Sequence, residues 1–539
     1  MATSEFIEVR EAQLPRVRLS DSRILRSESV ISSPVRAGFA VNVLKLVSGS
    51  ASAQLLTIAT APLIARMFAP EAFGMAAVFI SITGVVSAVV GMRYELSIVL
   101  PERDEEAANA AAVSFVFILL TTGLTALLLA YFADSLLRWL HAPELLPYLW
   151  LAPVTVLLNG VFAALSYWNT RKKNFGRLTV AQLASAIFFV IAQIAAGVAG
   201  HSSGGTIIVA TVLSILVSCV VLGGPTCVQH GALFVRSVRY RRMWAALRRY
   251  STFPKFSTAS AVISNVGWQM PTFVLSAFFS PSVVGHYAIG NKLLRVPVNL
   301  VGANIATVFF QHASEANHQG TLRQSVDGMF RHLIALCVFP SLLLGLIGKE
   351  LFVVAFGSRW AEAGIYTQIL SVYVLFWFMA VPLGIALNVM EKQALELRLI
   401  SLVLVARLVA LLVGGHYFGS ARWTLALFSI AGVLVYGRYC LVVLRHCSVP
   451  IPRITRILGH SIVTFLPAGA IVGALKYAGL RPLIIVAVSA FLVVIYYANL
   501  LRTEPTLREI ARGMMGKLKN GSHAQPRLSP LRSGETGVR

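Results

Sequence analysis

Acidic residues are scarce in this chain, which has 22 Asp and Glu against 46 Lys and Arg among its 539 residues. Charged residues of both signs make up only 13% of the sequence, and 57% of it is hydrophobic. Apolar runs of the roughly 20 residues that a membrane helix requires follow one another almost from end to end. This composition predicts a polytopic membrane protein and excludes a soluble multidomain enzyme of ordinary composition.

Cysteines are few, and nucleotide-binding motifs are absent from the sequence. The five cysteines show no C-x-x-C spacing, so we expect small apolar side chains rather than disulfides or metal ligands. No G-x-x-x-x-G-K-[ST] motif occurs, which excludes a P-loop ATPase within the chain and leaves a separate ATPase subunit open. No cofactor and no metal are expected.

Fourteen membrane helices are predicted from the apolar runs. They cover residues 38–65, 72–92, 107–132, 146–168, 178–200, 204–226, 256–279, 282–311, 329–348, 365–390, 397–416, 422–445, 456–476 and 481–501. The segments predicted on the inner side carry 34 Lys and Arg, and those on the outer side carry seven. Because basic residues concentrate in cytoplasmic loops, this ratio predicts that both termini are cytoplasmic. The net charge of +24 is thus an orientation signal, and nucleic acid is not an expected partner.

One short pattern occurs twice, at a constant offset of 211 residues. It comprises Phe68, Pro70 and Gly74 after the first predicted helix, and Phe279, Pro281 and Gly285 after the seventh. Pro and Gly are common in turns, so chance is the alternative explanation. The equivalent positions favour a duplicated unit of six helices, and such repeats place a substrate site between the two halves.

The predicted fold is all-α, with two parallel six-helix repeats around a central cavity and two additional C-terminal helices. No cleavable signal peptide opens the chain, so the first span is expected to direct insertion. The expected units are a polar cytoplasmic tail (1–37), an N-terminal half (38–226), a basic cytoplasmic loop (227–255), a C-terminal half (256–445), an additional helix pair (446–501) and a basic cytoplasmic tail (502–539).

The helix predicted at 282–311 contains two cations within an apolar run. Lys292, Arg295 and Asn299 are spaced by three and four residues and therefore share one helical face. A charge inside a membrane span is costly and usually faces a polar cavity or a partner. The alternatives are snorkelling and pairing with a carboxylate, but no acidic residue lies deep in any predicted span. The pattern predicts a cavity for an anionic substrate.

Further candidates surround this cationic turn. Arg407 lies at the centre of its span, whereas Lys45 lies near the cytoplasmic end, where it either snorkels or lines a vestibule. Gly290 and Pro297 bracket the cations and could permit bending. The other candidates are Arg93 and Glu95, for gating or an ion pair, and Asn265, Trp268 and Gln269, for sugar contact. Since Arg93 and Glu95 are two residues apart, a helix would direct them to different neighbours. Trp268 and Gln269 cannot both point inward.

Three segments resemble the Wzx-type polysaccharide flippases of the multidrug/oligosaccharidyl-lipid/polysaccharide exporter superfamily. They are RYELSIVLPERDEEAANA at 93–110, the run from RRYSTFPKF to FFQHASEA at 248–316, and FGSRWAEAGIYTQILS at 356–371. The resemblance implies a transporter that flips undecaprenyl-pyrophosphate-linked oligosaccharides across the bacterial inner membrane for O-antigen, capsule or exopolysaccharide assembly. It also implies that the protein contacts membrane lipids, and that a polysaccharide polymerase and a chain-length regulator act downstream as partners.

Other functions fit the sequence less well. A cation-coupled multidrug exporter would need a buried Asp or Glu in its spans. A membrane polysaccharide polymerase or glycosyltransferase would need acidic or metal-binding groups and a large outer loop, but the longest predicted outer loop is only 349–364. A structural scaffold would leave the intramembrane cations unexplained. The energy source stays open between membrane potential and proton coupling.

Overall fold

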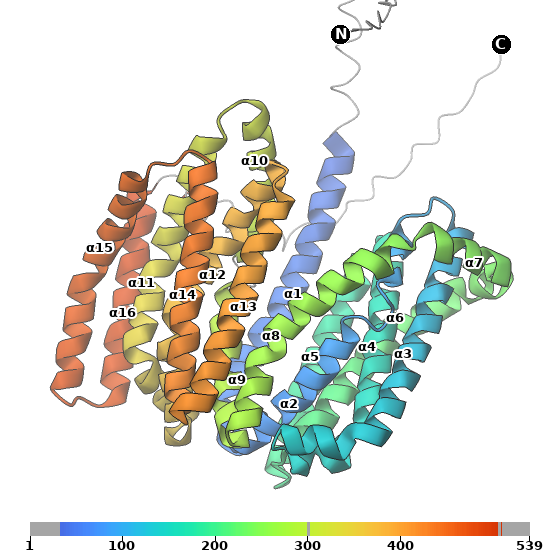
Figure 1. Cartoon of the computed structure of the whole chain (residues 1–539), viewed down its shortest axis with the longest axis horizontal. Helices are drawn as coiled ribbons and strands as arrows, with labels where there is room; N and C mark the ends of the chain where they lie inside the picture. The colour runs from blue at the N-terminus through green and yellow to red at the C-terminus, as the bar shows by residue number, and fades with distance from the viewer. Residues whose placement is uncertain (1–32, 299–301, 505–507, 509–539) are drawn as a thin grey trace, which may run out of the picture.

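The computed structural model describes residues 33–298, 302–504 and 508, and in this part of the chain every regular element is a helix (Figure 1). The N-terminal half comprises α1 (Ser33–Met67), α2 (Pro70–Ser87), α3 (Asp104–Trp139), α4 (Leu151–Arg171), α5 (Phe175–Val198) and α6 (Gly204–Ser237). The C-terminal half comprises α8 (Thr258–Phe278), α9 (Pro281–Pro297), α10 (Ala303–His318), α11 (Leu322–Phe356), α12 (Ala361–Val389), α13 (Gln393–Phe418) and α14 (Ala421–His446). The remaining helices are α7 (Tyr240–Arg249), α15 (Ile451–Tyr477) and α16 (Pro482–Thr503).

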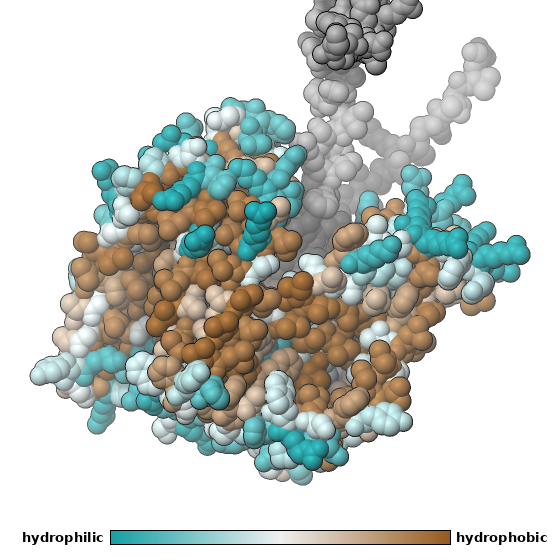
Figure 2. Space-filling model, in the orientation of Figure 1, coloured by the Kyte–Doolittle hydropathy of each residue, from teal (hydrophilic) through white to brown (hydrophobic). Residues whose placement is uncertain are grey.

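Eleven helices in the described residues are long and apolar enough to cross a membrane. A broad hydrophobic band separates two hydrophilic ends of the molecule (Figure 2), as expected for a multi-pass membrane protein. The predicted spans 38–65, 256–279 and 282–311 correspond to α1, α8 and α9 with α10, which are not among the eleven. The count of fourteen spans therefore stays a prediction.

The predicted boundaries are wrong in two places where the backbone changes conformation. The span predicted to end at residue 92 ends at Ser87, and turns follow, in which Met92 and Arg93 have positive φ values of 48° and 61°. Within the span predicted at 282–311, α9 covers Pro281–Pro297 and α10 covers Ala303–His318, and residues 299–301 between them lie outside the described part of the chain. The predicted outer loop 349–364 is mostly helical, since α11 continues to Phe356 and stops where Gly357 adopts a φ of 101°.

The two halves meet through α2 and α9, which carry the repeated pattern. Pro70 and Pro281 each occupy the first helical position, where the missing N–H costs no hydrogen bond. A Cβ on Gly74 would lie 1.8 Å from the Pro281 carbonyl oxygen, and one on Gly285 would lie 1.8 Å from the Pro70 carbonyl oxygen. Such a reciprocal contact is what two equivalent units related by a two-fold axis produce.

Further contacts join the halves at this same end of the bundle, here called the closed end. The buried Trp360, in the short helix η6 (Ser358–Trp360), donates from Nε1 to the Ala65 carbonyl at 2.8 Å. Arg66 donates to the Val354 carbonyl at 3.2 Å. The other end, here called the basic end, carries the segments 93–106, 169–177 and 227–255, and there the halves lie apart (Figure 1).

The last two helices pack against α11 on the outside of the C-terminal half. The Phe339 and Tyr496 rings stack with centroids 4.2 Å apart. Lys476 Nζ lies 3.1 Å from the Glu350 carboxylate. The helix pair therefore packs on α11, and its status as an addition to two six-helix halves stays a prediction.

Candidate functional site

A cavity of about 340 Å³ lies within the C-terminal half, between α8, α12, α13 and α14. Its lining includes the aromatic rings of Trp268, Trp377, Tyr436 and Tyr439. It also includes the neutral amide of Asn388, the carboxylate of Glu396 and the guanidinium of Arg407. An apolar pocket with a few convergent polar groups is the usual form of a small-molecule site. The sequence predicts a cavity between the halves, whereas this cavity lies inside one of them.

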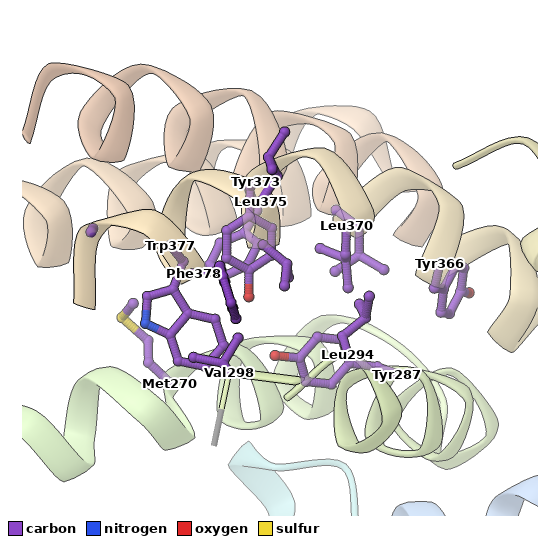
Figure 3. Packing of buried hydrophobic residues seen from close by; sticks show 14 of the residues in the cluster. Met270, Tyr287, Leu294, Val298, Tyr366, Leu370, Tyr373, Leu375, Trp377 and Phe378 are labelled. Carbon is purple, nitrogen blue, oxygen red and sulfur yellow. The ribbon is translucent and has the colours of Figure 1, made fainter. Parts of the chain in front are cut away.

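Arg295 is not among the residues that line this cavity, but it contacts one of them, Trp268. Its guanidinium carbon lies 4.4 Å from the centroid of the Trp268 ring, which packs on Trp377 at 4.9 Å. Trp377 is buried with Met270, Val298 and Phe378 between α8, α9 and α12 (Figure 3). The Arg295 Nε has no hydrogen-bond partner among the described residues. The contact with Trp268 is a cation–π interaction.

Lys292 lies one turn before Arg295 on the same face of α9. Its side chain is exposed, although it lies well inside the helix. Neither cation forms an ion pair within the described ranges 33–298 and 302–504. Asn299, the third predicted member of this face, lies outside the described residues. The role of this cationic face in binding an anion stays a prediction.

Arg407 is buried in a cage of aromatic rings at one wall of the cavity. Its guanidinium carbon lies 4.2 Å from the Phe428 ring centroid and 5.1 Å from that of Tyr373. Arg407 Nη1 donates to the Tyr436 hydroxyl at 3.4 Å, and Nε has no partner among the described residues. A cation that faces rings and one hydroxyl keeps its charge uncompensated, so it can attract an anion from the cavity.

Glu396 is a cavity residue that the sequence analysis missed. The predicted helix began at residue 397, whereas α13 begins at Gln393 and so includes Glu396. A Cβ on Gly384 would lie 2.4 Å from the Tyr439 hydroxyl and 3.8 Å from the Glu396 carboxylate, so these polar groups converge. Glu396 and Arg407 are eleven residues apart, about three helical turns. That spacing is the signal that could have placed them on one face.

Only one of the three predicted sugar contacts lines the cavity. Trp268 does, whereas Asn265 donates to the Ala261 carbonyl of its own helix at 3.0 Å. Gln269 accepts a hydrogen bond from Ser81 on α2 at 3.2 Å and so faces the other half. The expectation that Trp268 and Gln269 point in different directions is consistent with these contacts.

Gly290 has a packing role in addition to its predicted role as a hinge. A Cβ there would lie 2.7 Å from Thr367 Oγ1 and 3.2 Å from the Ala363 carbonyl oxygen, so the glycine lets α9 approach α12 closely. Pro297 is the last residue of α9. Bending at either residue stays a prediction. Lys45 belongs to α1, but its side chain lies outside the described residues.

Arg93 and Glu95 contact each other, contrary to the expectation of separate partners. Arg93 adopts a left-handed conformation before the 3₁₀ helix η2 (Tyr94–Val99), which brings its Nη1 to 3.9 Å from Glu95 Oε1. Glu95 is only 6% exposed, and its Oε2 has no partner in the described chain. Burial raises the pKa of the Glu95 carboxyl, while its own backbone N–H and the Arg93 charge oppose that rise.

Arg171 holds the loop that follows η2, a role that the loop-charge count did not reveal. Its side chain at the end of α4 donates to the Asp104 carboxylate at 3.1 Å and the Glu102 carbonyl at 3.0 Å. It also bonds to the Pro101 carbonyl. The loop between α2 and α3 is therefore fixed to the basic end of α4.

Comparisons with known proteins agree with this architecture. Succinoglycan biosynthesis transport protein ExoT of Rhizobium meliloti (strain 1021) is 24% identical over 315 residues, which cover 57% of this chain and 60% of that protein. The structure of lipid II flippase MurJ in an inward closed conformation matches with a TM-score of 0.67 and 11% identity, over 85% of this chain and 99% of MurJ. An inward-facing multidrug resistance MATE family transporter matches with a TM-score of 0.57 and 15% identity, over 75% and 94% of the two chains.

The structural matches show a shared fold and no more, because their sequence identities are low. The match to a family model, in contrast, is a match of sequence. Residues 63–365 match the model of a family described as polysaccharide biosynthesis protein, which is more than half of the chain. The chain belongs to this polysaccharide biosynthesis protein family.

Proposed function

We propose that this protein is a transporter that moves an undecaprenyl-pyrophosphate-linked oligosaccharide across the bacterial inner membrane, without covalent chemistry. The observation that carries the proposal is the set of cations Lys292, Arg295 and Arg407, none of which forms an ion pair within the described residues. A pyrophosphate that leaves water needs compensating charge, and cations in a low-dielectric site supply it. Arg407 lines the cavity, and Arg295 contacts Trp268, which also lines it.

The rest of the cavity suits the sugar part of such a substrate. Trp268 and Trp377 present aromatic surface that can pack against the C–H faces of sugar rings. Asn388 and Glu396 supply donor and acceptor groups for hydroxyls. The names of two relatives, a succinoglycan biosynthesis transport protein and a lipid II flippase, support the same substrate class.

The arrangement of the halves supports alternating access. The halves join at the closed end and lie apart at the basic end (Figure 1). We place the basic end and both termini in the cytoplasm, because basic loops concentrate there. The substrate would enter from this side, and rocking about the α2–α9 contact would release it outside. An inside-negative membrane potential favours outward movement of the anion.

Several predicted residues take roles in this proposal. Lys45 would line the cytoplasmic vestibule, Asn299 would add a hydrogen-bonding group beside the cations, and Arg93 with Glu95 would gate the basic end. Gly290 would permit bending, as would Pro297. A polymerase and a chain-length regulator would use the translocated product. A second candidate function, a cation-coupled drug exporter, is favoured by the carboxylate of Glu396 in the cavity.

The test is the leaflet position of the lipid-linked oligosaccharide in cells that carry Lys292→Ala together with Arg295→Ala. We expect the intermediate to accumulate on the cytoplasmic side at normal protein levels. Arg438→Ala is the matched control, because Arg438 is an exposed cation on α14 that does not line the cavity. Normal translocation in the double variant would contradict the site assignment. Changed drug resistance with normal translocation would favour the exporter instead.

A further inference from the structure

The helix α7 differs from its neighbours in length and in charge. It has ten residues, YRRMWAALRR, none of which is buried, and it is too short to span a membrane. The sequence analysis treated this segment as part of a basic loop. Six exposed arginines lie on α7 or just before it, and together they are called the α7 arginine surface here. They are Arg236, Arg239, Arg241, Arg242, Arg248 and Arg249.

One side of α7 is fixed to the N-terminal half. Leu247 packs in an apolar cluster with Tyr94 and Tyr250, and the Tyr94 hydroxyl donates to the Leu247 carbonyl at 3.1 Å. Asn109 on α3 donates to the Ser237 carbonyl at 2.9 Å and accepts from the Arg239 N–H at 3.0 Å. Asn109 therefore fixes the turn between α6 and α7. The position of α7 at the basic end of α3 is thus set by specific contacts.

The other side of α7 has few charge partners. Arg249 lies 3.4 Å from the Glu106 carboxylate, and the other five arginines form no ion pair among the described residues. Glu105 and Glu106 line a hollow of about 830 Å³ together with Arg103, Arg242 and Arg249. Cations thus outnumber carboxylates in this hollow, and the remaining arginines face outward.

Exposed apolar and aromatic groups lie beside these arginines. Tyr240 is 79% exposed and Trp244 is 47% exposed, and the Arg248 guanidinium lies 5.3 Å from the Trp244 ring centroid. Val235, near the end of α6, is 85% exposed. Arginine, tryptophan and exposed aliphatic groups at the end of a membrane helix are typical of the boundary between hydrocarbon and headgroups.

We propose that the α7 arginine surface binds the headgroups of anionic phospholipids in the leaflet at the basic end. Clusters of basic residues on an amphipathic helix attract such lipids. A phospholipid is favoured over the transported pyrophosphate, because α7 lies at the outer edge of the N-terminal half, on the far side of the bundle from α12, α13 and α14 (Figure 1). The inference does not depend on the proposed transport function.

The experiment measures lipid retained by the purified full-length protein in detergent, by native mass spectrometry during titration with phosphatidylglycerol or phosphatidylcholine. The test variant combines Arg241→Gln, Arg242→Gln and Arg248→Gln. We expect its phosphatidylglycerol affinity to fall about a hundredfold, from roughly fivefold per basic residue near an anionic surface. Phosphatidylcholine retention should not change, and added salt should weaken only phosphatidylglycerol binding.

A matched control removes the same charge at the basic end of the C-terminal half. It combines Arg398→Gln, Arg445→Gln and Arg456→Gln, which are exposed residues without an ion pair in the described chain. The control should keep wild-type affinity. An equal loss in both triple variants, or no loss in the α7 variant, would overturn the proposal. Tighter retention of inorganic pyrophosphate than of phosphatidylglycerol would overturn the choice of lipid.

A second measurement does not depend on how the triple variant folds. Brominated phosphatidylglycerol should quench the tryptophan fluorescence of the wild-type protein more strongly than brominated phosphatidylcholine does. Trp244→Phe should abolish this excess quenching, because Trp244 lies on α7 among the arginines. Equal quenching by the two lipids, or excess quenching that persists in Trp244→Phe, would contradict the proposal.

Discussion

The contact between Gly74 and Gly285 predicts how a single methyl group would alter the equilibrium between the two ends of the molecule. In Gly74→Ala the new Cβ would lie 1.8 Å from the Pro281 carbonyl oxygen, whereas real Cβ contacts essentially never fall below 3.0 Å. A backbone oxygen cannot rotate away, so α2 and α9 must separate by about 1 Å. Overpacking of this kind costs about 1–3 kcal/mol.

This cost falls on the conformation in which the closed end is sealed. If that conformation exchanges with one open at the closed end, a cost of about 1.4 kcal/mol changes the ratio of the two tenfold. Gly285→Ala should have the same effect, because its Cβ would meet the Pro70 carbonyl at the same distance. The double variant should exceed either single variant only slightly, since both substitutions separate the same helix pair.

The assay is the distribution of distances between spin labels placed on α2 and α9 near the closed end. Both single variants should shift the population toward longer distances. Gly123→Ala is the control, because nothing lies within 4 Å of a Cβ at Gly123 on α3. The reasoning is refuted if Gly74→Ala and Gly123→Ala give the same distribution, or if the two contact variants act additively.

Three further predictions concern charged groups. Arg407→Met should leave the melting temperature unchanged or higher, since an unpaired buried charge is replaced by an apolar chain, but should lower transport. Unchanged transport would show that Arg407 has a structural role and no role in transport. Glu396→Gln should reduce transport less than Glu396→Leu, because the amide still bonds to sugar hydroxyls; equal losses would indicate that the charge itself is needed. The pKa of Glu95 is raised in the folded state, so folding favours the protonated carboxyl. The free energy of unfolding therefore falls as the pH rises from the pKa of the unfolded state through that of the folded state. Glu95→Gln should therefore raise the melting temperature relative to the wild type at pH 7 more than at pH 4; a constant difference would contradict this.

Most of the helices could be predicted from sequence, because long apolar runs in a membrane must satisfy their backbone as helices. The repeated Pro and Gly pattern also predicted equivalent positions in the two halves. The structure gives a reason for the glycines, since Gly74 and Gly285 allow the halves to come into contact. Periodicity placed Lys292 and Arg295 on one face, but it could not place Trp268 beside Arg295, since that depends on how α8 and α9 cross.

Other features depend on backbone conformations or boundaries that the sequence does not reveal. Arg93 reaches Glu95 only because a non-glycine residue adopts a positive φ, which is uncommon. Glu396 was missed because the predicted helix started one residue too late. The helix α7 was missed because ten residues rich in arginine carry the same charge signal as a loop.

The most direct test of the proposed transport is reconstitution of the purified protein in vesicles that contain undecaprenyl-pyrophosphate-linked oligosaccharide in both leaflets. A membrane-impermeant glycosidase then reports how fast the inner-leaflet substrate becomes accessible. We predict that the wild-type protein and Arg438→Ala make all of the substrate accessible, whereas Lys292→Ala with Arg295→Ala leaves the inner-leaflet half protected. Protection of that half in vesicles with wild-type protein, at an imposed inside-negative potential, would contradict the account.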